Sequence, residues 1–126
     1  MQFASVRLVT NDIDGLIDFF AMLTGVAATR LAPEFAEIRL PGATLALSTQ
    51  SPVKQFNAGT ATAASNHSAI VEFQVDDVDV VRARLGDAPL DYAMQPATMP
   101  WGNRPMLLRD PDGNLVNIFA RSGRAA

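Results

Sequence analysis

The residues of this chain that could carry out chemistry are few and scattered. His67 is the single histidine, and the absence of cysteine excludes disulfides, thiolate metal sites and a cysteine nucleophile. His67 lies at the edge of a polar, aperiodic stretch, which favours a solvent-exposed residue. A metal ligand at this position would need carboxylate partners such as Glu37 or Glu72, and a general base is the other alternative. Arg7 and Glu72, in short β-prone segments, are the remaining charged candidates.

The loop of residues 95–103 is the second candidate. It contains Trp101, the only tryptophan, together with Met99 and two prolines. Aromatic and methionine side chains suit stacking against a planar ligand at the mouth of a pocket. Trp101 either stacks in this way or has a structural role, closing the open end of the fold or packing at a dimer interface.

Two pairs of similar segments indicate an internal duplication. Residues 6–14 resemble residues 71–79, and residues 40–47 resemble residues 111–118. A repeat of this length marks structural units that bury their apolar faces against one another. We therefore expect one domain, residues 1–126, made of module 1 (about 2–49), a connector (about 50–66) and module 2 (about 67–121).

The elements of each module follow from apolar spacing and from turn residues. The N-cap of the first predicted helix is Asn11 or Asp12, and Asp76-Asp77 caps the second; Gly25 and Gly86 end the helices. The predicted order is one strand, one helix and three strands, and this order occurs twice along the chain. Strands are expected at about 2–10, 26–32, 35–40, 43–49, 68–75, 90–94 and on both sides of residues 110–113, with helices at 12–24 and 77–85.

The segment Asp110-Pro111-Asp112-Gly113-Asn114 has the composition of a tight hairpin turn. Pro111 presets φ, Asp112 can bond its own backbone, and Gly113 accepts a positive φ. The two aspartates are assigned to the turn and not to chemistry.

This turn, the duplicated order, the paired starts NDID and DDVD and the Pro100-Trp101-Gly102 loop together resemble the vicinal oxygen chelate superfamily. That group includes glyoxalase I, the bleomycin-resistance proteins and the extradiol dioxygenases. The resemblance covers about residues 2–121. It implies an α+β fold of two βαβββ modules in tandem, forming a cup-shaped mixed sheet with the helices outside and commonly completed within a homodimer.

In enzymes of the superfamily four side chains hold a divalent metal, one from the first and one from the last strand of each module. The resemblance places these positions at Ser5, Ala46, Ile70 and Asn117. Such metals need several carboxylate or imidazole ligands, and alanine and isoleucine have no side-chain lone pair. We therefore expect no metal and no other cofactor.

Strand parity predicts what the cup presents in place of a metal. Arg7 and Glu72 would face it and either form an ion pair in the space of the metal or fix a polar group of a ligand. Glu72, with a pKa shifted by burial, is the one catalytic candidate. Parity also assigns Val6 and Leu8 to the helix-covered face. The predicted ligand-binding residues are Ser5, Arg7, Ala46, Ser48, Ile70, Glu72, Asn117 and Phe119, with Met99 and Trp101 at the rim.

The composition of the chain limits the classes of partner that the protein is expected to bind. The net charge is −3 and the ten basic residues are scattered, so no nucleic-acid partner is expected. No apolar run approaches the roughly 18 residues of a membrane span, and the N-terminus lacks a signal-peptide pattern. A cytoplasmic protein is therefore expected, and its mild acidity would suit a cationic ligand.

Three functions remain after these observations. The vacated metal positions favour a metal-free protein of the glyoxalase/bleomycin-resistance type that sequesters a small organic molecule, planar or cationic, in the cup. The alternative is a glyoxalase-like lyase or isomerase, or a dioxygenase, with a non-standard or absent metal site. The third is an interaction module whose cup is filled by side chains, and a shared fold does not decide among the three.

Overall fold

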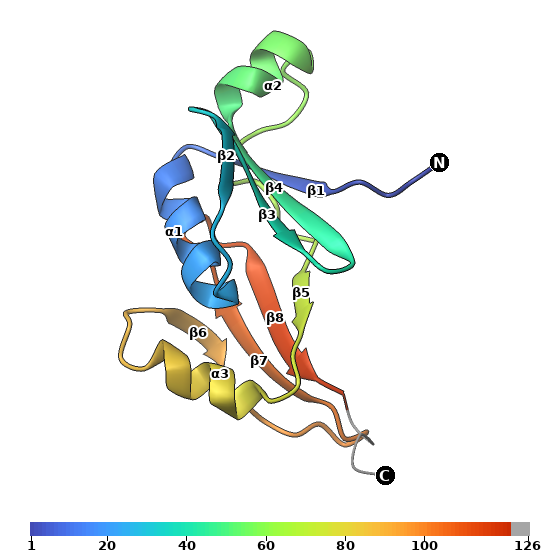
Figure 1. Ribbon diagram of the computed structural model, residues 1–126, viewed down its shortest axis with the longest axis vertical. Coiled ribbons are helices and arrows are strands. Elements are labelled where there is room, and N and C mark those ends of the chain that lie inside the picture. The colour runs from blue at the N-terminus through green and yellow to red at the C-terminus, as the bar shows by residue number, and fades with distance from the viewer. Residues whose placement is uncertain (122–126) are drawn as a thin grey trace. The chain divides into compact units, whose positions relative to one another are not determined.

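The computed structural model describes residues 1–121 and divides the chain into two compact units (Figure 1). Unit 1 comprises residues 1–65, and unit 2 begins at residue 66. Each unit contains a four-stranded sheet and a helix inserted between its first and second strands. The α+β prediction of two βαβββ modules in tandem is confirmed.

Unit 1 has a mixed sheet in the order β1-β4-β3-β2. Strand β1 is parallel to β4, and the other neighbours are antiparallel. Its elements are β1 (Val6–Thr10), α1 (Ile13–Thr24), β2 (Thr29–Ala32), β3 (Phe35–Leu40), β4 (Ala43–Thr49) and α2 (Gln50–Phe56).

Helix α1 covers one face of this sheet, against β3 and β4. The Asp12 carboxylate caps it by accepting from the Gly15 N–H at 3.0 Å, and Gly25 ends it with a φ of 72°. The apolar positions of α1 recur every three or four residues and pack into the core of unit 1. The buried side chains include Leu16, Phe20 and Leu23 from α1, and Ala36, Ile38, Leu45 and Leu47 from the sheet.

Unit 2 repeats this topology in the order β5-β8-β7-β6, with β5 parallel to β8. Helix α3 packs against β7 and β8. The elements are β5 (Val71–Gln74), α3 (Val78–Leu85), β6 (Asp91–Met94), β7 (Arg104–Arg109) and β8 (Leu115–Ala120). The core includes Val78, Leu85, Met106, Leu108, Val116 and Ile118.

The predicted hairpin between β7 and β8 is present, but a different aspartate stabilises it. Gly113 has a φ of 84°, and its N–H donates to the Asp110 carbonyl at 2.9 Å. The Asp110 carboxylate, and not that of Asp112, accepts the local bonds: from the backbone N–H groups of Asp112 and Asn114 at 2.9 and 2.8 Å, and from Asn114 Nδ2 at 2.7 Å. Oδ2 of Asp112 is buried without a hydrogen-bond partner.

The largest difference from the sequence-based prediction is α2. Residues 50–56, expected as part of an aperiodic connector, form a helix whose Val53 is fully buried. The strands at 26–32 and 68–75 are also shorter than predicted, at Thr29–Ala32 and Val71–Gln74. Burial of one apolar side chain and a few specific side-chain bonds are enough to order a short helix in a polar segment.

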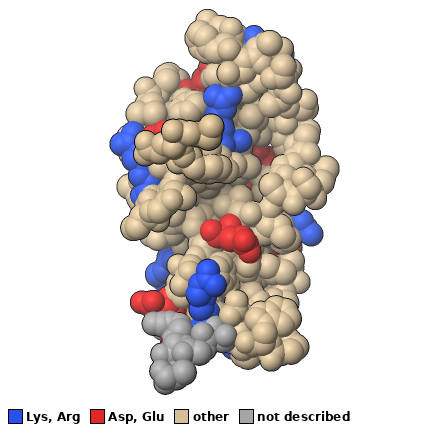
Figure 2. All heavy atoms as spheres, turned by 90° about the vertical axis from the view of Figure 1, so that its right-hand side faces the viewer, with Lys and Arg blue, Asp and Glu red and all other residues tan. Residues whose placement is uncertain are grey.

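Charge on the face shown in Figure 2 is dispersed. Lys, Arg, Asp and Glu side chains occur singly or in small groups between wide areas of uncharged residues. This face lacks the continuous basic surface that binds a nucleic-acid backbone. Among residues 1–121, no helix is both long enough and apolar enough to cross a membrane.

Candidate functional site

One face of the sheet in unit 1 brings together three predicted site residues. Register pairs Arg7 with Ala46 across β1 and β4, and pairs Ser48 with Phe35 across β4 and β3. Because paired residues in a sheet point to the same side, and alternate residues of one strand do too, these four side chains share a face. Leu45 and Leu47 point to the opposite face, which α1 covers.

The Arg7 side chain extends across β4 over this face. Its guanidinium carbon lies 5.8 Å from the centroid of the Phe35 ring, a cation–π arrangement, and Nη2 donates to Asn57 Oδ1 at 2.5 Å. Ala46 and Ser48, the β4 residues between these two strands, are 1% and 0% exposed. Their small side chains leave space for the Arg7 side chain. A glutamate or histidine at position 46 would fill that space.

Beside Arg7 lies an open cleft of about 550 Å³, which we call the Arg7 cleft. Strand β1, the segment joining β2 to β3, and helix α2 contribute its walls. Apolar and aromatic side chains line most of it, and Phe56 is 73% exposed. The lining residues are Arg7, Ala32, Pro33, Glu34, Phe35, Pro52, Gln55, Phe56 and Asn57.

Helix α2 and the segment after it form one wall of the Arg7 cleft, and the Gln50 side chain holds them in place. Gln50 Nε2 donates to the Ala61 carbonyl at 2.6 Å, and Oε1 accepts from the Ala63 N–H at 2.8 Å. The Ala64 N–H donates to the Val9 carbonyl at 3.0 Å, which attaches the segment to β1. The position of Asn57, and with it the Arg7–Asn57 bond, depends on these contacts.

Sequence reasoning missed most of this cleft, because it assigned residues 50–66 to a connector. Arg7 is the one predicted site residue among the lining residues. The available signal was weak: Val53 and Phe56 have helical spacing, and Pro52 is tolerated in a first helical turn.

In unit 2 the equivalent face of the sheet carries Glu72, Asn117 and Phe119. Register pairs Glu72 with Asn117 and Gln74 with Phe119. Asn117 Nδ2 donates to Glu72 Oε2 at 2.9 Å, whereas Asn117 Oδ1 is buried without a hydrogen-bond partner. Glu72 is exposed, so within this unit it lacks the burial on which a catalytic role depended. Arg7 and Glu72 thus each bond an amide side chain of their own unit.

The four positions that the resemblance assigns to metal ligands do not fit a divalent metal. Ser5 and Ile70 precede β1 and β5 and are exposed, and Ala46 and Asn117 lie within β4 and β8. One hydroxyl and one amide are their polar groups, where Zn²⁺, Ni²⁺ or Fe²⁺ requires imidazole or carboxylate. Residues 1–121 contain no other group of three His, Asp or Glu residues that could hold a metal.

The exposure of single residues agrees with two further expectations and qualifies a third. Val6 pairs with Leu45 on the face that α1 covers, as predicted, but it is 46% exposed at the sheet edge, whereas Leu8 is buried. His67 is exposed, in agreement with the structural interpretation of its position.

Met99 and Trp101 lie on a compact loop before β7. The Met99 N–H donates to the Asn103 carbonyl at 2.7 Å, and the Gly102 N–H donates to the Met99 carbonyl at 2.8 Å. Trp101 is 67% exposed, so its ring is largely free of its own chain.

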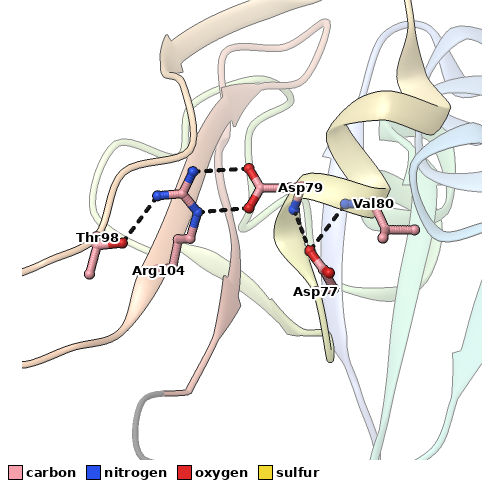
Figure 3. Close-up of polar contacts among 5 residues, drawn as sticks. All are labelled: Asp77, Asp79, Val80, Thr98 and Arg104. Carbon is pink, nitrogen blue, oxygen red and sulfur yellow. Dashed lines mark hydrogen bonds and ion pairs between the residues drawn. The ribbon is translucent and has the colours of Figure 1, made fainter. Parts of the chain in front are cut away.

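Arg104 connects this loop to helix α3 (Figure 3). Its Nε and Nη2 donate to the two carboxylate oxygens of Asp79, both at 2.9 Å, and Nη1 donates to Thr98 Oγ1 at 3.1 Å. Asp77 caps the helix by accepting from the Asp79 and Val80 N–H groups. The hydrogen bond from Arg104 lowers the pKa of Asp79 and the charge of Arg104 acts in the same direction, whereas burial opposes the shift.

Solved structures of similar fold come from several bacteria. A glyoxalase/bleomycin resistance protein/dioxygenase from Nocardioides is 22% identical with a TM-score of 0.79, over 98% of this chain and 85% of that one. A glyoxalase-related enzyme from Fulvimarina pelagi is 21% identical with a TM-score of 0.79, over 95% and 88%. A lactoylglutathione lyase from Agrobacterium tumefaciens is 18% identical with a TM-score of 0.73, over 94% and 92%.

No curated protein sequence is similar enough to be recognised as a relative. At these identities the solved structures establish the fold and not the activity. The family model of the Glyoxalase/Bleomycin resistance protein/Dioxygenase superfamily matches residues 2–118. This match covers both βαβββ units and the hairpin between β7 and β8, and the chain therefore belongs to that superfamily.

Proposed function

We propose that this protein binds and sequesters a small organic molecule and that binding requires no metal. The observation that carries the proposal is the chemistry of the four family positions: Ser5, Ala46, Ile70 and Asn117 replace the expected carboxylates and imidazoles. At one of them the Arg7 side chain passes over Ala46, which is nearly fully buried. At this position an arginine side chain that can bind a polar group of a ligand thus lies where the family would place a metal ligand.

The size and lining of the Arg7 cleft support this proposal. Sites for small molecules in proteins enclose about 300–1,000 Å³ and combine apolar walls with a few polar groups. The cleft, at about 550 Å³, combines aromatic and proline side chains with four polar residues, which are Arg7, Glu34, Gln55 and Asn57.

The proposal includes a cytoplasmic homodimer in which two modules complete each cup. Several large apolar side chains are exposed on the chain, among them Phe3 at 81%, Trp101 at 67% and Ile70 at 51%. Exposed apolar groups of this size are typical of surfaces that another molecule covers. Of the remaining predicted ligand contacts, Ser5 and Phe119 belong to the cup of the proposed homodimer, whereas Ser48 is fully buried within its own chain.

Native mass spectrometry of protein purified gently from its own host tests the proposal. A bound mass that matches an organic molecule, with no metal, supports it. One metal ion per chain would contradict it and favour an enzyme. The mass of the polypeptide alone would also count against it and favour an interaction module.

A metal titration tests the same point independently. We expect Ni²⁺, Zn²⁺ and Mn²⁺ to give no stoichiometric binding in calorimetry, because the four family positions supply one hydroxyl and one amide. A single tight site in the wild-type protein would show that the family positions are misplaced.

The alternative proposal is a glyoxalase-like lyase or isomerase, or a dioxygenase. The observation in its favour is the buried, unbonded Asn117 Oδ1 next to the Glu72 carboxylate. The similar fold of the Agrobacterium lactoylglutathione lyase supports it at the level of fold. Turnover of the hemithioacetal of methylglyoxal and glutathione, abolished by Glu72→Gln, would establish this alternative.

A further inference from the structure

We propose that the Arg7 cleft binds a planar organic carboxylate, with Arg7 paired to the carboxylate and the aromatic walls against the planar part. This inference rests on the proposed function, because it names the ligand class of a small-molecule site. It also differs from the cationic ligand that the net charge suggested.

The first argument is the unused hydrogen-bonding capacity of Arg7. A guanidinium has five N–H donors in a planar fork that matches a carboxylate. In the described part of the chain, Arg7 donates one hydrogen bond, from Nη2 to Asn57. Arg7 takes no part in the ion pairs that Arg30, Arg39 and Arg104 form within residues 1–121, so its guanidinium is not paired with a carboxylate of the described chain.

The second argument is the orientation of Arg7. The contact with Phe35 and the bond to Asn57 hold the guanidinium from two sides, at β3 and at the end of α2. A cation held in place loses less conformational entropy when a ligand binds than a mobile lysine would. The Asn57 amide oxygen accepts one hydrogen bond from Arg7 but leaves its positive charge in place. A carboxylate at this position would have neutralised that charge.

The third argument is the shape and polarity of the remaining walls. Flat apolar surfaces are provided by the side chains of Phe35, Phe56, Pro33 and Pro52. Phe56 is 73% exposed, so most of its surface is accessible to a ligand. Planar conjugated groups pack well against aromatic and proline rings. Arg7 and Glu34 are the two charged lining residues, so the cleft has no net charge, and an anionic head group is favoured only by direct contact with the Arg7 guanidinium.

Three isosteric probes test this inference on the full-length protein. Cinnamate, cinnamamide and cinnamylamine share a planar body and carry a negative, neutral and positive head group. We expect cinnamate to bind with one site per chain and about tenfold more tightly than cinnamamide, because a charge-assisted pair at a positioned guanidinium adds this much. Cinnamylamine should bind weakest. Calorimetry supplies the affinities.

Three substitutions separate the contribution of the Arg7 side chain from that of net charge. Arg7→Gln should reduce cinnamate affinity about tenfold and leave that of cinnamamide unchanged. Lys54→Gln removes the same charge from an exposed residue of α2 that does not line the cleft, and should alter affinity by less than about twofold. Arg7→Lys keeps the charge but lacks the fork and should give an intermediate affinity. Unchanged circular dichroism shows that each variant is folded.

Amide chemical shifts identify where the probe binds. Cinnamate should shift the resonances of Glu34, Gln55, Phe56 and Asn57 in the wild-type protein and leave them unchanged in Arg7→Gln. Equal affinity for cinnamate and cinnamamide, absence of binding, or shifts confined to unit 2 would each overturn the inference.

The outcomes also distinguish this inference from the proposed function. A neutral molecule in the native mass spectrum, with no preference for cinnamate, leaves metal-independent binding intact and rejects the carboxylate site. An Arg7-dependent cinnamate site in a protein that purifies with tightly bound metal rejects the proposed function and keeps the site.

Discussion

At the scale of single residues, two aspartates of unit 2 meet opposite environments. Asp110 is 5% exposed, and burial raises its pKa although three hydrogen bonds to the charged form oppose the shift. Asp79 is exposed at the start of α3, and Arg104 lowers its pKa. The same side chain thus organises a turn in one place and connects a helix to a loop in the other.

Replacing Asp110 should destabilise unit 2 by removing the acceptor that organises the hairpin. Asp110→Ala deletes three hydrogen bonds to a carboxylate, and we expect a loss of about 2 kcal/mol in the free energy of unfolding. Asp112→Ala, whose Oδ2 is buried without a partner, should cost less than about 1 kcal/mol. Urea unfolding of both variants measures the difference, and equal losses would contradict this role of Asp110.

The Asp79–Arg104 pair predicts a pH dependence of stability. Because the folded pKa of Asp79 lies below its ordinary value of 3.8, its contribution is present above that value and is lost as pH falls through the folded pKa. Asp79→Asn should therefore lower Tm at neutral pH, and the difference from wild type should shrink in acid. Asp18→Asn, at an exposed position of α1, serves as the control. A Tm difference that grows on acidification would exclude this linkage.

At the scale of elements, helix α2 decides where the candidate site lies. It begins directly after β4 and brings Gln55, Phe56 and Asn57 to the Arg7 side chain. Its sequence has weak helical signals, and the Gln50 side chain and buried Val53 compensate for them. Ala58 and Ala64 in the following segment have positive φ values of 57° and 55°, a strained conformation for alanine that the surrounding contacts maintain.

Removing the Gln50 side chain should loosen α2 and leave the sheet intact. We expect Gln50→Ala to speed hydrogen exchange at the amides of residues 57–64, because two bonds to the Ala61 carbonyl and the Ala63 N–H are lost. Amides of β3 and β4 should exchange as in the wild type. Gln55→Ala, on the same helix, is the matched control, and uniform acceleration across unit 1 would show that α2 is not an independent element.

At the scale of the whole molecule, duplication explains both the fold and the proposed assembly. The two units share the same strand order and the same parallel pairing of first and last strands. Both first strands lie at a sheet edge, and exposed apolar residues occur there, Val6 in β1 and Ile70 just before β5. Edges of this kind are stabilised when another chain covers them.

The proposed homodimer predicts two linked observations in solution. Light scattering after gel filtration should give twice the mass of the chain. Dilution to the monomer should shift the fluorescence emission of Trp101, the only tryptophan, to longer wavelength if the partner covers this 67% exposed ring. A dimer with unchanged emission on dilution would place Trp101 outside the interface, and a monomeric mass at all concentrations would reject the assembly.

The sequence by itself determined the elements whose signals are local. Apolar spacing, acidic N-caps and terminal glycines predict α1 and α3, and the turn of residues 110–114 predicts the hairpin, because capping, periodicity and turn preference act between residues close in the chain. The repeat then establishes the βαβββ order. The resemblance to the superfamily then implies which strand positions correspond to its metal ligands, namely Ser5, Ala46, Ile70 and Asn117.

Only the tertiary structure determined where the Arg7 cleft lies and which residues contact its charged side chains. The short helix α2, the crossing of Arg7 over β4 to Phe35 and the bond to Asn57 join residues up to 50 positions apart in the chain. Such contacts depend on packing, burial and side-chain length, which act across space and leave no periodic pattern in the sequence. For the same reason Glu72, conspicuous in the sequence, is bonded to Asn117, whereas Arg7 became the centre of the candidate site.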